Sequence, residues 1–566
     1  MNTDSKLSIM EDAFPNFESS TSSAKVHEQA YDWYKTCRES HKICQRLGSR
    51  ERFAPSRLID VGAEGDNSWK LCLYPKDMAD PPNYLTLSYR WAQKPTVVLL
   101  SSTIDDFRRG APIDNLPRTF RDAITVARYF SVRYLWIDSL CIVQDSPDDW
   151  ARESVRMHKV YANSSCNIAA SASDSPDGGL FRSRVAGDAL LGYVKIDFPG
   201  GPPKKFEIWD QFHIDRLTQG PLTGCGWVFQ ERVLSSRVLH FSRSQIVWEC
   251  FEVNKCEMFP NQSPYPTEAS FSLGLKTVYA FFRSGPWSSF AKQEEKIMSV
   301  GVYDQWNHLV KEYSRCALTC PDDRLIAMSG IAEMYKKHTG DEYLAGLWKS
   351  RLIEGLNWVV VSPVARPQNH FRVPSWSWAA VDAAVLPQWT NLPRDDDLVK
   401  VINAMVEIPK TPAGWQHING SIELRGCLSK ATIWEGSRRS SMGENVVLKL
   451  VDLPSRFFAY PDTTDTTFED GKILYLLPLR STLRRLMKQE GTETEKLIGT
   501  PLIILEGIIM EPVPEVDASY RRVGQFVVDS LDHIGFFGLL AIRPYPKKRP
   551  TKVIVDDTQT SLITFV

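Results

Sequence analysis

The chain has 566 residues, and at roughly 100–200 residues per domain this length predicts two or three domains. Lys and Arg total 67 against 68 Asp and Glu, so the net charge of −1 supplies no general field that would recruit nucleic acid or an acidic membrane surface. Hydrophobic residues make up 43% of the chain, which excludes a largely disordered protein. We therefore expect a folded protein that does not bind nucleic acid.

The start of the chain is rich in Ser, Asp and Glu, and residues 1–27 are expected to form a disordered tail. It has no basic segment followed by an apolar run, and the longest apolar stretch, around Ile534–Ile542, is far shorter than the roughly 20 residues that span a bilayer. Eleven cysteines without a signal peptide predict reduced thiols. We expect a cytoplasmic protein without a membrane segment.

The segment Ala30–Leu47 places Trp33, Cys37, His41 and Cys44 on one face of a helix. Three of these are metal-ligand types, but no fourth ligand is evident nearby, and Cys and His commonly pack in a buried apolar stripe. Packing is therefore the preferred interpretation, and no metal is expected.

Strands and helices alternate between residues 84 and 171. Residues 84–89 read as a strand, Leu116-Pro117-Arg118 opens a helix, and 134–138 form a second strand. Ser146 is a candidate N-cap for a helix that begins at Pro147 and runs to about Tyr161, and 166–171 form the next strand. This order predicts an α/β fold with a mainly parallel sheet.

The later part of the chain changes character. Residues 227–231 indicate a short helix, and 238–241 and 246–250 indicate two strands. The pattern is helical from Val302 to about Trp358, strand-like and Trp-rich over Arg372–Asp382, and β-rich from 401 to 566. The expected domains are 28–260 with the N-terminal helix, a helical and Trp-rich connecting region 261–385, and a β-rich region 386–566.

Polar and aromatic side chains follow two of the predicted parallel strands. Ser88, Arg90 and Trp91 end one strand and Asp138 ends another. Because ligands settle beyond the carboxyl ends of such strands, we expect a site at this edge. The helix from Pro147 carries Glu153 inside its apolar stripe, where a carboxylate is costly unless it is paired.

Two interpretations of Glu153 stay open. It is either paired to an arginine, such as Arg90 or Arg118, or it faces a pocket as an acid, base or charge stabiliser. In the same way, Asp138 either belongs to the site or caps a turn, and Gln230-Glu231 either cap a helix or line the pocket mouth. No P-loop, GxGxxG or GxSxG is present, so the nucleotide-binding and hydrolase classes that carry them lack their signatures.

Several strings resemble the three blocks of the fungal heterokaryon incompatibility (HET) domain. They are YLTLSYRWAQ (84–93), RYLWIDSLCIVQD (133–145) with DWARESVRMHKVYANSSCNIAA (149–170), and GWVFQERVLSSRVLHFSRSQIVWEC (226–250). Two positions depart from the usual pattern, since Ala92 stands where the first block has Gly and Cys225 where the third has a basic residue.

The resemblance implies a fungal protein of self/non-self recognition that triggers programmed cell death. The family is also remotely similar to TIR domains, several of which cleave NAD, and this implies a TIR- or flavodoxin-like sheet. Trp150-Ala151-Arg152-Glu153 resembles the TIR helix that carries a catalytic glutamate, so the resemblance makes Glu153 the candidate catalytic residue. Asp138, at the end of its strand, is the second catalytic candidate. NAD is then the candidate substrate, with no separate cofactor. Trp91 or Tyr89 would stack on a base or the nicotinamide, and Arg90 would hold the pyrophosphate. The full set of candidate binding residues is Ser88, Tyr89, Arg90, Trp91, Gln144, Asp145, Trp227, Gln230 and Glu231.

Three functions compete at this stage. The first is a cell-death effector with NAD-glycohydrolase-like activity, regulated through self-association or a protein partner. The second is a non-enzymatic interaction module of a death-signalling complex. The third is a HET-like enzyme of a fungal secondary-metabolite pathway, which the departures at Ala92 and Cys225 keep open.

Overall fold

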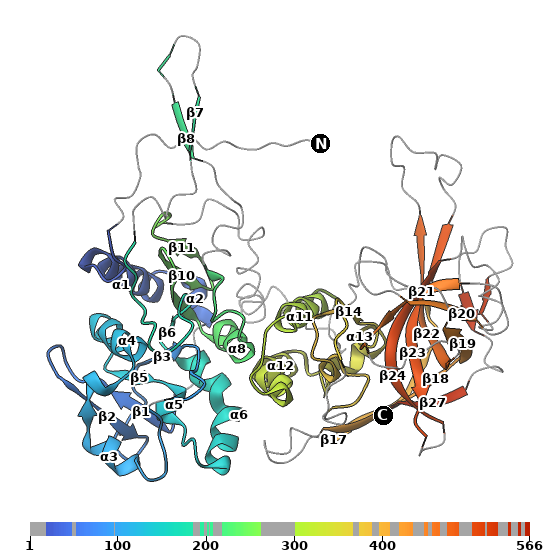
Figure 1. The fold of residues 1–566 in the computed structure, drawn as a ribbon, viewed down its shortest axis with the longest axis horizontal. Helices are drawn as coiled ribbons and strands as arrows, with labels where there is room; N and C mark the ends of the chain where they lie inside the picture. Colours follow the sequence, from blue (N-terminus) through green and yellow to red (C-terminus); the bar gives the residue numbers. More distant parts are fainter. Residues whose placement is uncertain are drawn as a thin grey trace. The chain divides into compact units, whose positions relative to one another are not determined.

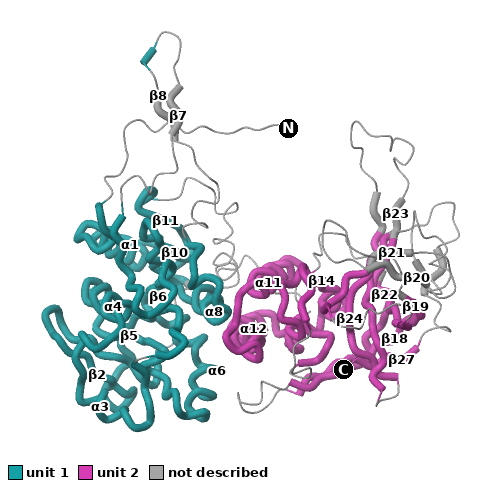
Figure 2. The backbone as a smooth tube through the Cα atoms, viewed as in Figure 1, with its two compact units in different colours: residues 1–294 teal, residues 295–566 magenta. Residues whose placement is uncertain are grey.

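The chain forms two compact units, residues 1–294 and 295–566 (Figure 2). A computed structural model provides the coordinates. The structure describes residues 18–47, 52–95, 97–184, 193–196, 201–202, 204–207, 218–261, 300–365, 373–387, 396–407, 418–433, 446–450, 456–464, 472–485, 501–514, 518–529, 542–544, 553–555 and 561–565. Most of the apolar stretch around Ile534–Ile542 and most of the expected tail thus lie outside the described residues.

Unit 1 begins with two helices, α1 (Ala24–Glu39) and α2 (Lys42–Leu47). The Ser23 hydroxyl caps α1 by accepting a hydrogen bond from the Val26 amide, so the helix starts inside the segment expected as tail. The single helix predicted over 30–47 is wrong, because the chain breaks at Ser40 and His41 before it turns into α2. The break places His41 in a buried position between the two helices.

Four parallel strands form the centre of unit 1. These are β3 (Tyr84–Ser88), β5 (Tyr134–Trp136), β6 (Cys166–Ala169) and β9 (Arg237–Phe241), which lie side by side in the order β5-β3-β6-β9. Every residue of β3, β6 and β9 is buried, as expected for strands covered on both faces. The chain order reverses between β3 and β6, which makes their carboxyl ends a topological switch point.

Antiparallel strands extend this sheet on both sides, so the expected mainly parallel sheet is in fact a mixed one of nine strands. Short connections join β1 to β2, β9 to β10 and β10 to β11, and strands joined by such short connections can pair only antiparallel. One edge holds β1 (Arg57–Asp60), β2 (Ser68–Leu73) and β4 (Ala111–Pro112), and the other holds β10 (Ile246–Cys250) and β11 (Asn254–Cys256). The α/β character is confirmed.

Helices cover both faces of the sheet (Figure 1). Tyr34 of α1 stacks on Phe130, next to the end of α4, whereas α6 and α8 pack against each other. The connecting helices thus lie on opposite faces of the sheet. Right-handed crossover connections produce this arrangement when the chain adds strands first on one side of β3 and then on the other. The helices are α3 (Ile104–Arg109), α4 (Arg118–Tyr129), α5 (Asp138–Cys141), α6 (Pro147–Asn163) and α8 (Gly226–Leu234), and a hairpin is formed by β7 (Tyr193–Ile196) and β8 (Lys204–Glu207).

The first part of unit 2 is helical and rich in tryptophan. The helical pattern predicted up to Trp358 is interrupted after Thr339 by a short hairpin and resumes only in the short helix Leu352–Gly355. The strand predicted over 372–382 is wrong: its described part forms turns and a 3-10 segment, Trp378–Ala380, capped by Ser377. The indole nitrogens of Trp358 and Trp378 donate to backbone carbonyls in this core. The elements are α11 (Val300–Tyr313), α12 (Ile326–Thr339), α13 (Leu352–Gly355) and the short hairpins β12 (Tyr343–Leu344) with β13 (Leu347–Trp348) and β14 (Val359–Val360) with β15 (Val385–Leu386).

The rest of unit 2 is a ten-stranded sheet, which confirms the predicted β-rich C-terminal region. Its strands are β16 (Asp396–Asp397), β17 (Lys400–Glu407), β18 (Asn419–Gly426), β19 (Ser429–Ile433), β20 (Val446–Leu450), β21 (Arg456–Pro461), β22 (Ile473–Arg485), β23 (Pro501–Pro512), β24 (Ser519–Asp529) and β27 (Ser561–Phe565). A separate hairpin joins β25 (Ile542–Pro544) to β26 (Val553–Val555). Among the described helices, none has the length and apolar character needed to cross a membrane.

Candidate functional site

The switch point between β3 and β6 holds a connected group of buried polar side chains. Ser88 ends β3, and its hydroxyl lies 2.9 Å from the Asn167 amide nitrogen, which donates to it from β6. The Thr86 hydroxyl donates to the Asn167 carbonyl oxygen at 3.0 Å. Buried polar groups persist when they satisfy one another, so this network fixes the Ser88 hydroxyl at the carboxyl ends of the two strands.

Glu231 reaches this network from α8. The Ser88 hydroxyl donates to its carboxyl group, and the Tyr161 side chain of α6 also hydrogen-bonds to it. Burial, together with the nearby Asp138 carboxylate, raises the Glu231 pKa to about 8 against the lowering effect of the hydrogen bonds from Ser88 and Tyr161. Glu231 is thus a carboxyl group that exchanges its proton near neutral pH, a property that clusters at functional sites.

Asp138 connects this buried group to the protein surface. It follows β5 as the first residue of α5, where one carboxylate oxygen accepts from the Trp91 indole nitrogen at 2.7 Å and the other from the Ser139 amide at 2.7 Å. Burial raises the Asp138 pKa against these hydrogen bonds. Trp91 is 40% exposed and lies over the Tyr89 ring at an interplanar angle of 13°. A flat aromatic surface therefore meets solvent beside a carboxylate.

The other predicted binding residues divide between this rim and the interior. Arg90 is exposed beside Trp91, and Trp227 is half-buried on α8. Gln230 is buried within the same helix as Glu231, so the alternative that Gln230-Glu231 cap a helix is wrong. Gln144 and Asp145 instead make hydrogen bonds to neighbouring loops of the same chain.

The contacts of these two loop residues are specific. The Gln144 amide donates to the Ile142 carbonyl at 2.9 Å and to the Asp138 carbonyl at 3.3 Å. The exposed Asp145 accepts from the Ser101 amide and hydroxyl at 2.8 and 3.0 Å. Gln144 thereby shapes the turn that carries Asp138.

Glu153 lies in a different environment, among arginines. It is buried on α6 as its position in the apolar stripe predicts, and it accepts from the Ser56 hydroxyl at 2.9 Å. Its carboxylate is 3.6 Å from both Arg152 and Arg156 and 3.9 Å from Arg57. Glu153 is thus paired with arginines, as one of the two interpretations predicts. The partners are Arg57, Arg152 and Arg156, and not the expected Arg90 or Arg118.

Two members of the switch-point group, Asn167 and Tyr161, were missed by the sequence interpretation. Asn167 could have been predicted from the sequence, because a side-chain amide inside the apolar strand 166–169 needs a polar partner. Tyr161 gave none, since tyrosine is ordinary in an apolar stripe and only the fold directs its hydroxyl toward Glu231.

Comparison with known families identifies the region that holds this group. Residues 84–231 match the family model described as heterokaryon incompatibility protein (HET). The chain contains a HET domain. The match runs from the first residue of β3 to Glu231 itself, so the HET domain includes Ser88, Asp138 and Asn167. No curated protein and no solved structure matches the chain.

Proposed function

We propose that the HET domain hydrolyses the bond between nicotinamide and ribose in NAD, and that this reaction triggers cell death during self/non-self recognition. The observation that carries the proposal is the pair of carboxyl groups, Asp138 and Glu231, at the carboxyl ends of the parallel strands. Enzymes that cleave glycosidic bonds commonly use two carboxyl groups in different environments.

The two carboxyl groups have different roles in this mechanism. Asp138, next to the exposed Trp91, stabilises the positive charge that develops on the ribose as the bond to nicotinamide breaks. The ionised form of Glu231 accepts a proton from the attacking water. With a pKa of about 8 this form is the minor one at neutral pH, and it is a stronger base than an ordinary carboxylate. Ser88 and Asn167 orient the Glu231 carboxyl group. The products are nicotinamide, ADP-ribose and one proton.

The rim supplies groups of the right kind for a dinucleotide. Trp91 and Tyr89 offer rings on which a base stacks, and Arg90 offers a guanidinium for the pyrophosphate. To reach Asp138, the substrate displaces the Trp91 indole from its carboxylate. The order β5-β3-β6-β9 is that of the first four strands of a flavodoxin-like sheet, which supports a TIR- or flavodoxin-like relationship.

The test measures nicotinamide release from NAD by the full-length protein at raised concentration, because self-association or a protein partner is part of this proposal. Wild type is compared with Glu231→Gln, Asp138→Asn and Glu153→Gln, with circular dichroism to show that each is folded. We expect a loss of 100-fold or more, on the order of one missing catalytic group, in the first two variants and little change in Glu153→Gln.

Two results would contradict the proposal in different ways. Loss of activity in Glu153→Gln with activity retained in Glu231→Gln would keep NAD cleavage and return catalysis to Glu153. No release by the folded wild type at any concentration would remove the enzymatic proposal and favour the interaction module.

A further inference from the structure

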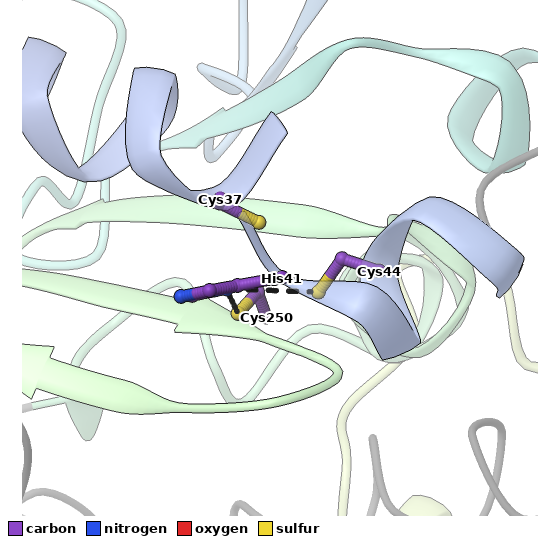
Figure 3. A group of neighbouring side chains, drawn as sticks. All are labelled: Cys37, His41, Cys44 and Cys250. Carbon is purple, nitrogen blue, oxygen red and sulfur yellow. Dashed lines mark hydrogen bonds between the residues drawn. The ribbon is translucent and has the colours of Figure 1, made fainter. Parts of the chain in front are cut away.

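Four buried side chains from distant parts of unit 1 converge at one point. Cys37 lies in the last turns of α1, His41 in the break between helices, Cys44 on α2 and Cys250 at the end of β10. Figure 3 shows the four side chains facing one another, with the His41 ring joined to Cys44 and Cys250. His41 and Cys250 are 209 positions apart in the chain, so only the fold brings the fourth residue to the other three.

We propose that Cys37, His41, Cys44 and Cys250 bind one Zn²⁺ as a structural Cys₃His site. The four candidate ligand atoms all lie within 4.8 Å of one another, and His41 Nδ1 is 3.4 Å from Cys250 Sγ and 4.0 Å from Cys44 Sγ. Ligand atoms around a tetrahedral zinc ion lie about 3.5–3.8 Å apart. No pair of ligand atoms therefore has to come closer by more than about 1 Å to surround the ion.

The charge of the surroundings fits a metal bound by thiolates. Three thiolates and one Zn²⁺ carry a net charge of −1, which a buried site must balance. The buried Arg237 guanidinium donates from Nε to Cys37 Sγ at 3.1 Å, and Lys255 interacts electrostatically with Cys250 and Cys37. The Val253 amide donates to Cys250 Sγ at 3.4 Å. Such outer contacts hold first-shell sulfur ligands in place.

The set of ligands favours zinc in a structural role. Three soft thiolates and one imidazole in tetrahedral arrangement are typical of structural zinc, and all four residues are buried, which leaves no open position for a substrate. Arg237 begins β9 and Ser165 precedes β6, and the Arg237 side chain contacts both Cys37 and the Ser165 carbonyl. The metal therefore lies at the amino ends of the parallel strands, the opposite edge from Glu231.

The proposed ion would fix the N-terminal helices to the edge of the sheet. Two contacts already join the same elements: the Trp33 indole donates to the Pro260 carbonyl at 2.9 Å, and the Ile43 amide donates to the Glu252 carboxylate at 2.9 Å. All four ligands lie outside residues 84–231, so the family match does not include this site.

The experiment measures the metal content of the untagged full-length protein by mass spectrometry after purification without chelator. We expect one zinc per chain in wild type and its loss in Cys250→Ser and Cys44→Ser. Cys256→Ser is the matched control, because Cys256 is a buried cysteine on the neighbouring strand β11 that is not in the ligand set, and it should keep the zinc.

A second measurement keeps the test decisive if the ligand variants fail to fold. Zinc in wild type is exchanged for Co²⁺, and we expect the absorption bands of a tetrahedral cobalt–thiolate centre together with a higher melting temperature than that of the chelator-treated protein. Folded wild type with substoichiometric metal, or with a disulfide between any two of the three cysteines, would overturn the proposal.

Discussion

Two buried glutamates of the HET domain show how the same side chain takes on different chemistry within one fold. Glu153 on α6 has three arginines within 4 Å and a serine hydroxyl donating to it. Glu231 on α8 has a serine, a tyrosine and a second carboxylate around it, and its pKa rises to about 8. Two glutamates that are equally buried in one domain therefore differ in the charges beside them: arginines surround Glu153, whereas Glu231 lies near another carboxylate.

The strongest test of this difference removes the most buried of the three arginines beside the α6 carboxylates. Arg57 pairs with Asp149 and lies near Glu153, and its side chain is largely buried. Arg57→Ala should lower the free energy of unfolding by about 3 kcal/mol, since it leaves buried carboxylates with too little positive charge. Urea denaturation measures the loss.

The control for this variant is an exposed ion pair of the same unit, Arg109 with Asp106. Arg109→Ala should cost less than about 1 kcal/mol, as exposed pairs do. Equal losses of unfolding free energy in the two variants would mean that the buried ion pairs around Glu153 stabilise the protein no more than an exposed pair does.

A second test uses the pH dependence of stability. The pKa of Glu231 rises from 4.5 to about 8 in the folded protein, so its contribution to stability is fully present below 4.5 and is lost as the pH rises through 8. Glu231→Gln should remove a decline of a few kcal/mol over this range. Melting temperatures across the pH range measure the effect in wild type and variant.

The matched variant here is Glu153→Gln, which should leave the decline between pH 4.5 and 8 in place. A wild-type profile that is flat over the same window would contradict the environment described for Glu231.

The smallest expected effect concerns the hydroxyl of Tyr161. Its hydrogen bond lowers the pKa of Glu231 against the effect of burial, so Tyr161→Phe should raise that pKa further and cost about 1 kcal/mol of stability. The carboxyl stretching band of Glu231 in infrared difference spectra, assigned with Glu231→Gln, reports the titration. A lower pKa in Tyr161→Phe would exclude the hydrogen bond.

Local patterns predicted the elements of the HET domain well, because each element there has its own capping or periodic signal. Pro147 and Ser146 place the start of α6 correctly, and the apolar stripe predicts that Glu153 is buried. The strand predicted around Trp378 was wrong, because alternating tryptophans that pack into the core from a loop give the same sequence pattern as a strand.

Partners distant in the chain were beyond the reach of the sequence patterns. Nothing in the spacing of residues connects Arg57 with Glu153, or Cys250 with His41, because these pairs form only when the strands take their places. The candidate site shows the same limit: Ser88 and Asp138 were found as strand ends, whereas the link from Ser88 to Glu231 depends on how α8 packs.

The contact between α1 and β10 has a consequence for how this protein is made. A ribosome adds about 5–20 residues per second, so α1 leaves the exit tunnel on the order of ten seconds or more before β10 is synthesised. During that interval the apolar face of α1, with Val26, Trp33 and Tyr34, lacks its last partner strand. The nascent chain therefore presents a ready binding surface for a chaperone until residue 250 has emerged.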